Sequence, residues 1–560
     1  DYRKREENGF RDFSHAFESI LTTLDEQACD SVLFSLYTLD ISGTNGLSGL
    51  GSDNNDVIDT NNVEKYSINI PFGSKIYVKD GQEVKANQTL AEWDPYTLPI
   101  IAERDGFIKY VDNYDFTDNN DYFNYNVPTA QAQSFYFNGA KTQEAFNISM
   151  TTWGVSAQGH DAAIAVFHHS NELVFAAHAE RYSRVKNDPQ LNLPIVMEAL
   201  RFGEPEKIIW YEDPGLKWVR RAFTNSFNNK EVAPAKYMHQ FYTKKVSHKF
   251  VKHHHSHAAA GYYTSPFTDA TVIVIDAIGE WDTFTIWTGE GRKLKKRFSK
   301  LYPNSLGLWY SAMTQRCDLI PNEHEYILMG MSALGDPDRL YDSIKKDFFV
   351  KTGADFQAMH NLHRGCKWWN PTEDNLFDIA AATQKIYEEF LDDICLFALK
   401  NCPSKNVVLM GGCALNCVAN SKITHYWDNV WIMPNPGDAG SAVGAVLAYN
   451  KDFIHWPGAM LGHNIVGEYP VDTVVNHLGT IRIVGVASGK AEFGPRALGN
   501  RSLLADPRGE DIKDLVNQYK KREPFRPFAP AILEEHVHDY FDIPVDKSPY
   551  MQWVGKCKYP

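Results

Sequence analysis

The sequence lacks the features that mark several large classes of protein. It has 56 basic against 70 acidic side chains, so its formal net charge is −14. A chain with that balance has no broad basic face, which argues against nucleic acid as a partner. It also has no apolar run long enough to span a bilayer and no signal peptide at its first residues. We therefore expect a cytoplasmic protein with no membrane partner.

Cysteine is sparse. The eight cysteines are scattered along the 560 residues and none forms a Cys-x-x-Cys pair, which leaves a zinc ribbon or a thioredoxin motif unsupported. Free thiols in a reducing cytoplasm are the prediction. Hydrophobic residues make up 43% of the chain, so most of it should fold, and the length predicts two to four domains.

The first 149 residues differ in character from the rest. Residues 1–41 predict a helix–strand fragment of unknown role. Residues 42–149 predict linkers around a small β-rich segment at about 64–112. Around Ala91–Ile100 this segment resembles a fragment of the bacterial RNA polymerase largest subunit. It contains none of that enzyme's catalytic metal loop, so no polymerase activity follows.

From Met150 onward, strands alternate with long helical stretches, which is typical of an α/β protein. Residues 152–159 and 162–167 predict a β-hairpin with polar residues at its tip. His160 lies at that tip, where an imidazole can accept a proton or polarise a small polar group.

Two histidines and two aspartates predict a metal centre. His253 and His257 would share one face of a helix, at i and i+4. The buried strand 270–275 ends at Asp276, on the sheet edge where ligands gather in open α/β folds. Asp438 follows strand 429–433 and can complete a His2Asp2 set. Such a set suits Fe(II), Zn(II) or Mn(II). The alternative is a polar helix end whose histidines form ordinary hydrogen bonds and bind no metal.

Glycines and arginines predict a phosphate site. Strand 407–410 runs into Gly411-Gly412, a turn that admits a nucleotide but also occurs in simple packing. After strand 484–487, a turn is predicted at Gly489-Lys490. The following arginines lie among glycines, prolines and aromatic residues up to Pro530, and guanidinium groups hold phosphate through paired hydrogen bonds. We prefer a polyphosphate pocket there over a solvated basic surface.

Together these motifs closely resemble the NodU/CmcH family of O-carbamoyltransferases from about residue 150 to 560. The motifs that carry the resemblance are Gly159-His160-Asp161, Glu180 to Lys186, His253 to His257, Asp276 to Glu280, Ser305-Leu306-Gly307, Gly411 to Asn416, Asn435 to Asp438, and Glu492 to Pro530. Ala277 departs from the glycine that is usual in the family after the strand aspartate.

The resemblance implies an actin/Hsp70/sugar-kinase-like (Kae1-like) domain at 150–455 and a YrdC-like domain at 456–560, the latter shorter than in the family. In that family the YrdC-like part forms carbamoyl adenylate from carbamoyl phosphate and ATP, and the Kae1-like part transfers the carbamoyl group to a hydroxyl. The implied cofactors are ATP with Mg and a divalent metal, Fe(II) ahead of Zn or Mn. The implied acceptor is a sugar, nucleoside or natural product, and a homodimer is one option for assembly.

The resemblance also implies roles for individual residues. The implied metal ligands are His253, His257, Asp276 and Asp438. The residues implied to line the transfer site are His160 and Lys186. The residues implied to bind nucleotide and phosphate are Gly411, Gly412, Asn416, Arg496, Arg501, Ser502 and Arg526.

Two other hypotheses stay open. One is a threonylcarbamoyl transferase that acts on tRNA, which shares the Kae1-like fold; the acidic balance and the arginine-rich segment speak against it. The other is an inactive composite chain, in which pieces of other proteins precede a truncated transferase. The internal Met150 and the early end of the YrdC-like part motivate that second hypothesis.

Overall fold

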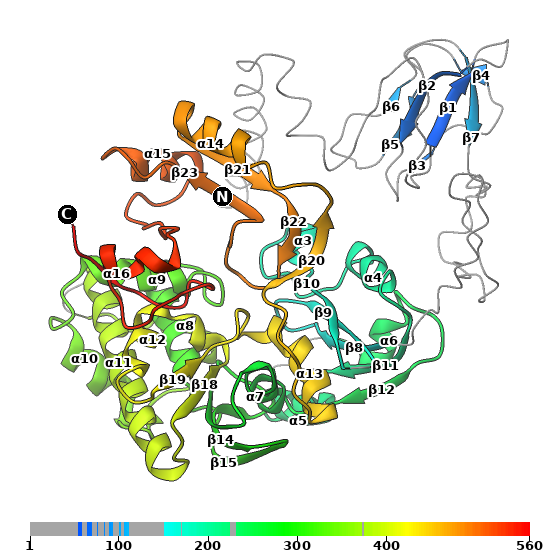
Figure 1. Ribbon diagram of the computed structural model, residues 1–560. Helices are drawn as coiled ribbons and strands as arrows, with labels where there is room; N and C mark the ends of the chain where they lie inside the picture. The colour runs from blue at the N-terminus through cyan, green and yellow to red at the C-terminus, as the bar shows by residue number, and fades with distance from the viewer. Residues whose placement is uncertain are drawn as a thin grey trace. The chain divides into compact units, whose positions relative to one another are not determined.

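The structure is a computed structural model. It describes residues 151–559, except 170, 225–230 and 372–374, together with strands between Asn54 and Tyr110. The chain forms two compact units, Asp1–Asn147 and Ile148–Pro560 (Figure 1). The boundary between them lies next to Met150, where the sequence pattern changes. The helix–strand fragment predicted for 1–41 lies outside the described residues.

The first unit contains two small antiparallel sheets, with strand orders β2-β1-β7-β4 and β3-β5-β6. Their strands are β1 (Asn54–Ile58), β2 (Glu64–Asn69), β3 (Lys75–Ile76), β4 (Glu83–Val84), β5 (Thr89–Glu92), β6 (Ile100–Ile101) and β7 (Gly106–Tyr110). The β-rich character predicted for this segment is confirmed, and its likeness to RNA polymerase stays a prediction.

Two five-stranded sheets of the same plan form the centre of the second unit. The first has the order β10-β9-β8-β11-β12 and the second the order β15-β14-β13-β18-β19. The first is built from β8 (Thr151–Ser156), β9 (Ala163–His168), β10 (Leu173–His178), β11 (Pro205–Trp210) and β12 (Ser247–Phe250). The second is built from β13 (Asp269–Ile275), β14 (Asp282–Glu290), β15 (Lys293–Leu301), β18 (Asn406–Met410) and β19 (Asn429–Trp431).

In each sheet, three antiparallel strands are followed by two strands that run parallel to the first of them. The duplicated sheet confirms the predicted α/β, actin/sugar-kinase-like fold. The hairpin predicted at 152–167 is confirmed too, since Ser156 pairs with Ala163. The repeat is structural, because the sequence shows no short internal repeat.

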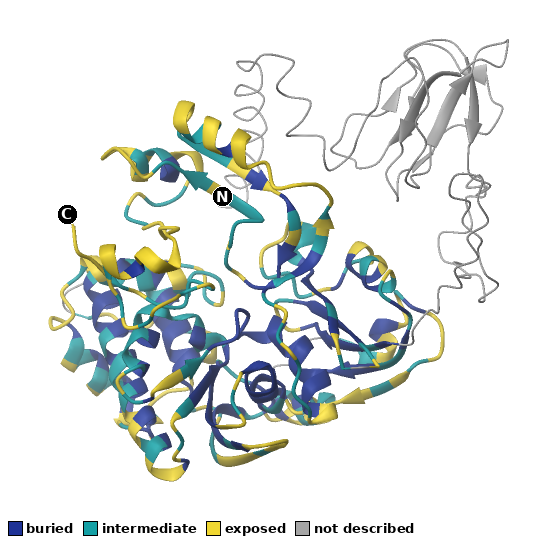
Figure 2. Ribbon diagram, in the orientation of Figure 1, coloured by how far each residue is buried: buried dark blue, intermediate teal, exposed yellow. Residues whose placement is uncertain are grey.

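Two buried helices, α7 (His253–Thr264) and α13 (Ser441–Asn450), pack against each other and on the sheets (Figure 2). Small residues allow this close approach. A Cβ on Gly154 of β8 would lie 1.8 Å from the carbonyl oxygen of Ala442, and one on Gly444 would lie 1.9 Å from that of Ser256. Backbone is therefore packed on backbone, which fixes the helix ends that carry the site.

Further helices cover the sheets. Those beside the first sheet are α3 (Glu180–Ser183), α4 (Leu193–Leu200), α5 (Pro214–Thr224) and α6 (Pro234–Met238). Those beside the second are α8 (Leu306–Arg316), α9 (Glu325–Met331), α10 (Tyr341–Phe348), α11 (Leu376–Asn401) and α12 (Cys417–Ile423). Two apolar cores result, and the second is formed largely by α8 to α12 with the inner strands. None of the described helices has the length and hydropathy of a membrane span.

The last hundred residues form smaller elements. They are β20 (Met460–Ile465), α14 (Val471–Thr480), β21 (Ile483–Ala487), β22 (Gly489–Glu492), β23 (Arg501–Ala505), α15 (Ile512–Tyr519), α16 (Val537–Tyr540), β24 (Phe541–Asp542) and β25 (Lys556–Cys557). The turn predicted at Gly489-Lys490 is wrong. Residues 489 and 490 instead belong to β22, which pairs with β20. Gly489 starts this strand with a left-handed backbone conformation, at φ +57°.

Candidate active site

The N-terminal turns of α7 carry two of the predicted metal ligands. The helix begins at His253, so His253 and His257 lie one turn apart on the face that meets the strand ends. Both imidazoles are buried, and so are the carboxyl groups of Asp276, directly after β13, and Asp438, three residues before α13. Three segments that are distant in the sequence therefore meet at one edge of the second sheet.

Ligand-type atoms of these four side chains converge on one point and all lie within 4.8 Å of one another. The Nε2 atoms of His253 and His257 are 3.0 Å apart. Asp438 Oδ1 lies 3.2 Å from each of them, and Asp276 Oδ2 lies 3.2 Å from His253 Nε2 and 3.8 Å from His257 Nε2. Both imidazoles thus present the same ring nitrogen to the two carboxylates.

The outer atoms of His257 and Asp276 have partners that hold their orientation. Ser441 Oγ lies 3.2 Å from His257 Nδ1, and the amide of Gly412 donates to Asp276 Oδ1 over 3.0 Å. Glu212 Oε2 lies 3.9 Å from His253 Nδ1, outside hydrogen-bond range. Metal-binding histidines typically have their second ring nitrogen oriented in this way by an oxygen atom.

The carboxylates are charged despite their burial. Burial raises the pKa of Asp438, but the positive charges of His253 and His160 outweigh that effect and hold the pKa well below its ordinary value. Burial and the neighbouring Asp438 also raise the pKa of Asp276, while bonding to His253 and the charge of His257 bring it down overall. Charged oxygens and imidazole nitrogens are the donor set of a divalent cation.

His160 lies at the edge of this cluster. Its Nε2 is 3.6 Å from Asp438 Oδ2, its Nδ1 is 3.1 Å from Asp161 Oδ2, and its side chain is 46% exposed. Desolvation lowers the pKa of His160, but the charges of Asp438 and Asp161 raise it overall. His160 therefore lies within reach of a group that binds beside Asp438.

Lys186, the second residue implied for the transfer site, pairs with another partner. Its Nζ lies 3.2 and 3.0 Å from the two carboxylate oxygens of Glu180, and its side chain is half-exposed. The structure brings His160 to the cluster, whereas the bonds of Lys186 run to the carboxylate of α3.

The glycine turn predicted for the nucleotide meets the centre directly. Gly411 has φ +92°, and a Cβ there would lie 2.1 Å from the carbonyl oxygen of Ile275. Asn416 caps α12 through the amide of Ala419 and exchanges two hydrogen bonds with Gln384. Arg496 donates to the carbonyl of Leu415 over 3.1 Å, so the arginine-rich segment reaches this turn.

The other predicted phosphate ligands are bonded locally. The guanidinium of Arg501 donates to four carbonyl oxygens, those of Ser488, Asn500, His463 and Gly489. Ser502 Oγ accepts from the amide of Gly499. Arg526 lies over the ring of Tyr326 and pairs with Glu523. Their roles toward phosphate stay predictions.

Sequence reasoning assigned no role to several buried polar residues near the centre. Glu280 Oε1 accepts from the backbone amides of Asp213 and His253, over 2.6 and 2.9 Å. His178 accepts from the amide group of Asn435 at 2.9 Å. Glu212 follows β11, so the strand-end rule that singled out Asp276 could have found it.

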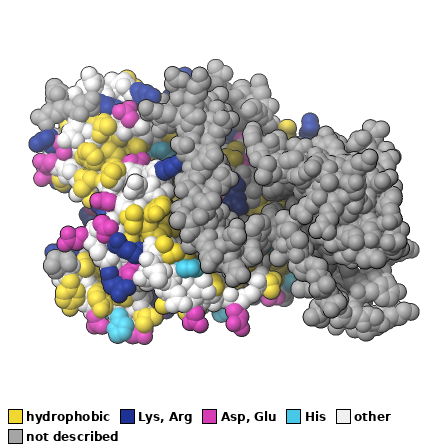
Figure 3. All heavy atoms as spheres, turned by 90° about the horizontal axis from the view of Figure 1, so that it is seen from above, with side chains coloured by type: hydrophobic (Ala, Val, Ile, Leu, Met, Phe, Trp, Pro, Cys, Tyr) yellow, Lys and Arg dark blue, Asp and Glu magenta, His cyan; other side chains and the backbone are white. Residues whose placement is uncertain are grey.

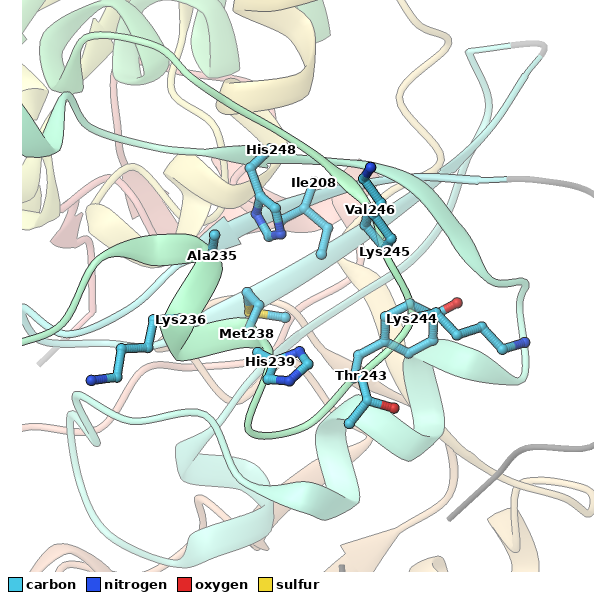
Figure 4. Close-up of a pocket in the computed structure, with 11 residues that line it drawn as sticks. Ile208, Ala235, Lys236, Met238, His239, Thr243, Lys244, Lys245, Val246 and His248 are labelled. Carbon is cyan, nitrogen blue, oxygen red and sulfur yellow. The ribbon is translucent and has the colours of Figure 1, made fainter. Parts of the chain in front are cut away.

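A separate pocket of about 440 Å³ lies between β11, α6 and the chain leading to β12 (Figure 4). Ile208, Met238 and Val246 line it with His239 and His248. The lysines at its rim, such as Lys236, extend outward rather than into it. It contains none of the predicted site residues.

Acidic and basic side chains stand side by side on the coloured part of the face in Figure 3. That part of the surface therefore offers no continuous basic area.

Comparison with known families covers both regions of the second unit. The model described as "Carbamoyltransferase N-terminus" matches residues 212–447, and the model "Carbamoyltransferase C-terminus" matches residues 475–559. The first match contains the four clustered side chains, and the second contains the arginine-rich segment.

Curated proteins with similar sequences include nodulation proteins and an uncharacterised protein. An uncharacterised protein of Synechocystis sp. is 31% identical over 72% of this chain and 79% of its own length. The nodulation protein NolO of Bradyrhizobium diazoefficiens is 30% identical over 55% of this chain and 63% of its length. Nodulation protein U of Sinorhizobium fredii is 34% identical over 33% of this chain and 36% of its own. The chain thus spans less than two-thirds of these nodulation proteins.

Similar solved structures include HypF in its phosphate- and nucleotide-bound form, at 12% identity and a TM-score of 0.31 over 54% of this chain and 56% of HypF. They also include the HypF of T. kodakarensis, at 12% identity and a TM-score of 0.34 over 55% and 48%. The assignment therefore rests on the two family models and on the Synechocystis relative, and by these the chain belongs to the carbamoyltransferase family.

Proposed function

We propose that this chain is an O-carbamoyltransferase that uses carbamoyl phosphate and ATP to form carbamoyl adenylate and transfers the carbamoyl group to a hydroxyl of a small molecule. Transfer is assigned to residues 150–455 and adenylate formation to 456–560. The observation that carries the proposal is the buried His2Asp2 cluster inside the segment that matches the carbamoyltransferase model.

The cluster fits a divalent metal. An ion bound at about 2.0–2.2 Å to oxygen and nitrogen holds its ligand atoms roughly 3–3.5 Å apart, and the closest ligand atoms here are 3.0 to 3.2 Å apart. His253, His257, Asp276 and Asp438 would hold the ion, with Fe(II) the first choice and Zn or Mn the alternatives. When bound, it would supply a Lewis acid that polarises the carbamoyl carbonyl.

The chain's own residues account for positioning and proton movement. In the transfer step the acceptor oxygen bonds to the carbamoyl carbon, the bond from that carbon to the adenylate oxygen breaks, and AMP leaves. The hydroxyl proton must pass to a base at the site. His160 is partly exposed and touches Asp438, so it can carry a proton between the centre and solvent.

The phosphate groups are assigned to the glycine turn and to Arg496. Arg496 uses one bond for the carbonyl of Leu415, and a guanidinium has five N–H donors. The remaining donors can face a phosphate next to Gly411 and Gly412. Adenylate formation would use ATP with Mg; its balance requires one water and releases both phosphate and pyrophosphate.

The test uses the full chain with carbamoyl phosphate, ATP and Mg, and follows exchange of labelled pyrophosphate into ATP. We expect exchange that depends on carbamoyl phosphate in the wild type and in H257A, and carbamoyl transfer in the wild type alone. Absence of that exchange from the wild type would overturn the proposed adenylate. Undiminished transfer by H257A would overturn the role of the cluster.

A further inference from the structure

The inference concerns Arg220, a buried arginine on α5 that the proposed chemistry does not use. Arg220 is 7% exposed. Its Nε and Nη1 atoms are buried and have no hydrogen-bond partner among the residues that the structure describes. A buried charged group without a partner is costly, and one that persists calls for a ligand or a functional reason.

The neighbouring cations on the same helix are matched with carboxylates. Lys217 Nζ lies 2.5 Å from Glu212 Oε1 and 3.2 Å from Glu231 Oε1. Arg221 forms a two-pronged pair with Glu231. Since these two cations take both carboxylates, Arg220 is the member of the group that is left over.

The remaining carboxylate nearby is also occupied. Glu280 Oε1 accepts two backbone amides, those of Asp213 and His253. Lys217, three residues before Arg220 on the same helix, pairs with Glu212, and Glu212 Oε2 lies 3.9 Å from Nδ1 of His253. Arg220 therefore lies next to the residues that hold the ligand His253, with donors to spare.

More positive charge gathers at the same place. Desolvation lowers the pKa of His363, and the charges of Arg220, Arg364 and Arg221 lower it further. Arg364 and His363 are exposed. The surroundings of Arg220 are therefore positively charged, which favours an oxyanion as the ligand.

Aromatic side chains border the same position. Phe223, three residues after Arg220, shares its side of the helix and is 81% exposed. Its ring meets that of Trp281 edge-on, with centroids 6.1 Å apart. Trp281 belongs to the loop that leads from the ligand Asp276 to β14, so this apolar edge adjoins the metal cluster.

We propose that Arg220, with Phe223 and Trp281, forms the acceptor subsite, and that the acceptor is a small molecule with a ring and an anionic group such as a carboxylate or a phosphate. The proposal rests on the proposed function. It places the acceptor on the His253 side of the cluster, whereas the glycine turn, assigned to the donor, contacts the cluster at Asp276.

The test compares two acceptors that differ in one anionic group, glucuronate and glucose, in the full chain. Wild type should prefer glucuronate at least about tenfold in kcat/KM, because only its carboxylate can form a charge-assisted pair with Arg220. R220Q should abolish the preference and R220K should retain part of it. R292Q removes an exposed arginine that pairs with Asp452 and should leave the preference unchanged. Equal preference in wild type and R220Q overturns the proposal.

Ligand binding tests the acceptor subsite independently of the proposed transferase activity. We expect glucuronate and inorganic phosphate to raise the melting temperature of wild type and R292Q more than that of R220Q. R220Q itself should melt no lower than wild type, because it removes an unpartnered buried charge; a large drop would mean a structural role instead. Absence of pyrophosphate exchange would contradict the proposed function, but it would not affect this binding measurement. A raised KM for carbamoyl phosphate in R220Q, with acceptor preference intact, would reassign the anion to the donor and overturn the subsite.

Discussion

His257 Nε2 and Asp438 Oδ1 lie 3.2 Å apart although 181 positions separate the two residues in the chain. The contact joins the first turns of α7 to the turn that precedes α13, and these two helices pack on each other through glycine and alanine. Any change that separates the helices should therefore disrupt the cluster before it unfolds the protein.

The first prediction concerns metal content. H257A should lose the bound ion, because it removes one of the four side chains whose ligand atoms converge on it. Elemental analysis of purified wild type should find about one divalent ion per chain, and H257A far less. H255Q is the matched control, because His255 lies on the same helix but stacks on Trp287. Full metal content in H257A would contradict the ligand assignment.

The second prediction concerns the glycine turn. G411A should destabilise the protein by at least about 2 kcal/mol, since an L-residue at φ +92° is strained and its Cβ would overlap the carbonyl of Ile275. G437A is the control, because a Cβ at Gly437 meets nothing within 4 Å. Denaturant unfolding should show a loss for G411A alone. Similar losses in both variants would show that the turn tolerates a side chain.

The third prediction concerns pH. Burial lowers the pKa of His178 from 6.5 to about 4, so the folded protein keeps this imidazole neutral. Below pH 6.5 the unfolded chain takes up the proton and the folded chain does not, so stability falls as the pH drops and levels off near pH 4. Above pH 6.5 both states are neutral and the group adds no pH dependence.

The size of this effect follows from the shift, which amounts to about 3 kcal/mol at most by order of magnitude. H178Q keeps an acceptor for Asn435 but cannot titrate. Denaturant unfolding between pH 7.5 and pH 4.5 should therefore show a smaller loss of stability in H178Q than in wild type. Parallel pH profiles would show that His178 is not the titrating group.

The fourth prediction separates two arginines of the same segment. R501K should loosen the segment around β20 and β22, because lysine cannot reach the four carbonyls that Arg501 bonds. R496Q should instead leave stability within about 0.5 kcal/mol and lower the pyrophosphate exchange rate at least about tenfold, by loss of a charge-assisted bond to phosphate.

Limited proteolysis and the exchange assay together give the readout. We expect faster cleavage within residues 488–500 for R501K and an unchanged cleavage pattern for R496Q. If R501K folds and protects this segment like wild type, the bonds of Arg501 do not brace it. If R496Q exchanges pyrophosphate at the wild-type rate, Arg496 does not bind phosphate.

The sequence alone determined the local elements and much of the ligand set. A four-residue spacing fixes which histidines share a helix face, and a buried strand that ends in aspartate fixes where its carboxylate emerges. These follow from helix and strand periodicity, so His253, His257 and Asp276 could be predicted without coordinates. Element boundaries followed less closely, since the strand predicted at 429–433 ends at Trp431.

Only the tertiary structure decided which arginine side chains keep hydrogen-bond donors free to bind a ligand. Arg496, Arg501 and Arg220 are the same residue type, yet one reaches the glycine turn, one binds four carbonyls and one is buried without a partner. The duplicated sheets and the bonds of Glu280 to the amides of Asp213 and His253 were likewise hidden, because partners distant in sequence meet through packing. Sequence periodicity reports the direction of a side chain within its own element, whereas hydrogen-bond partners depend on how elements pack together.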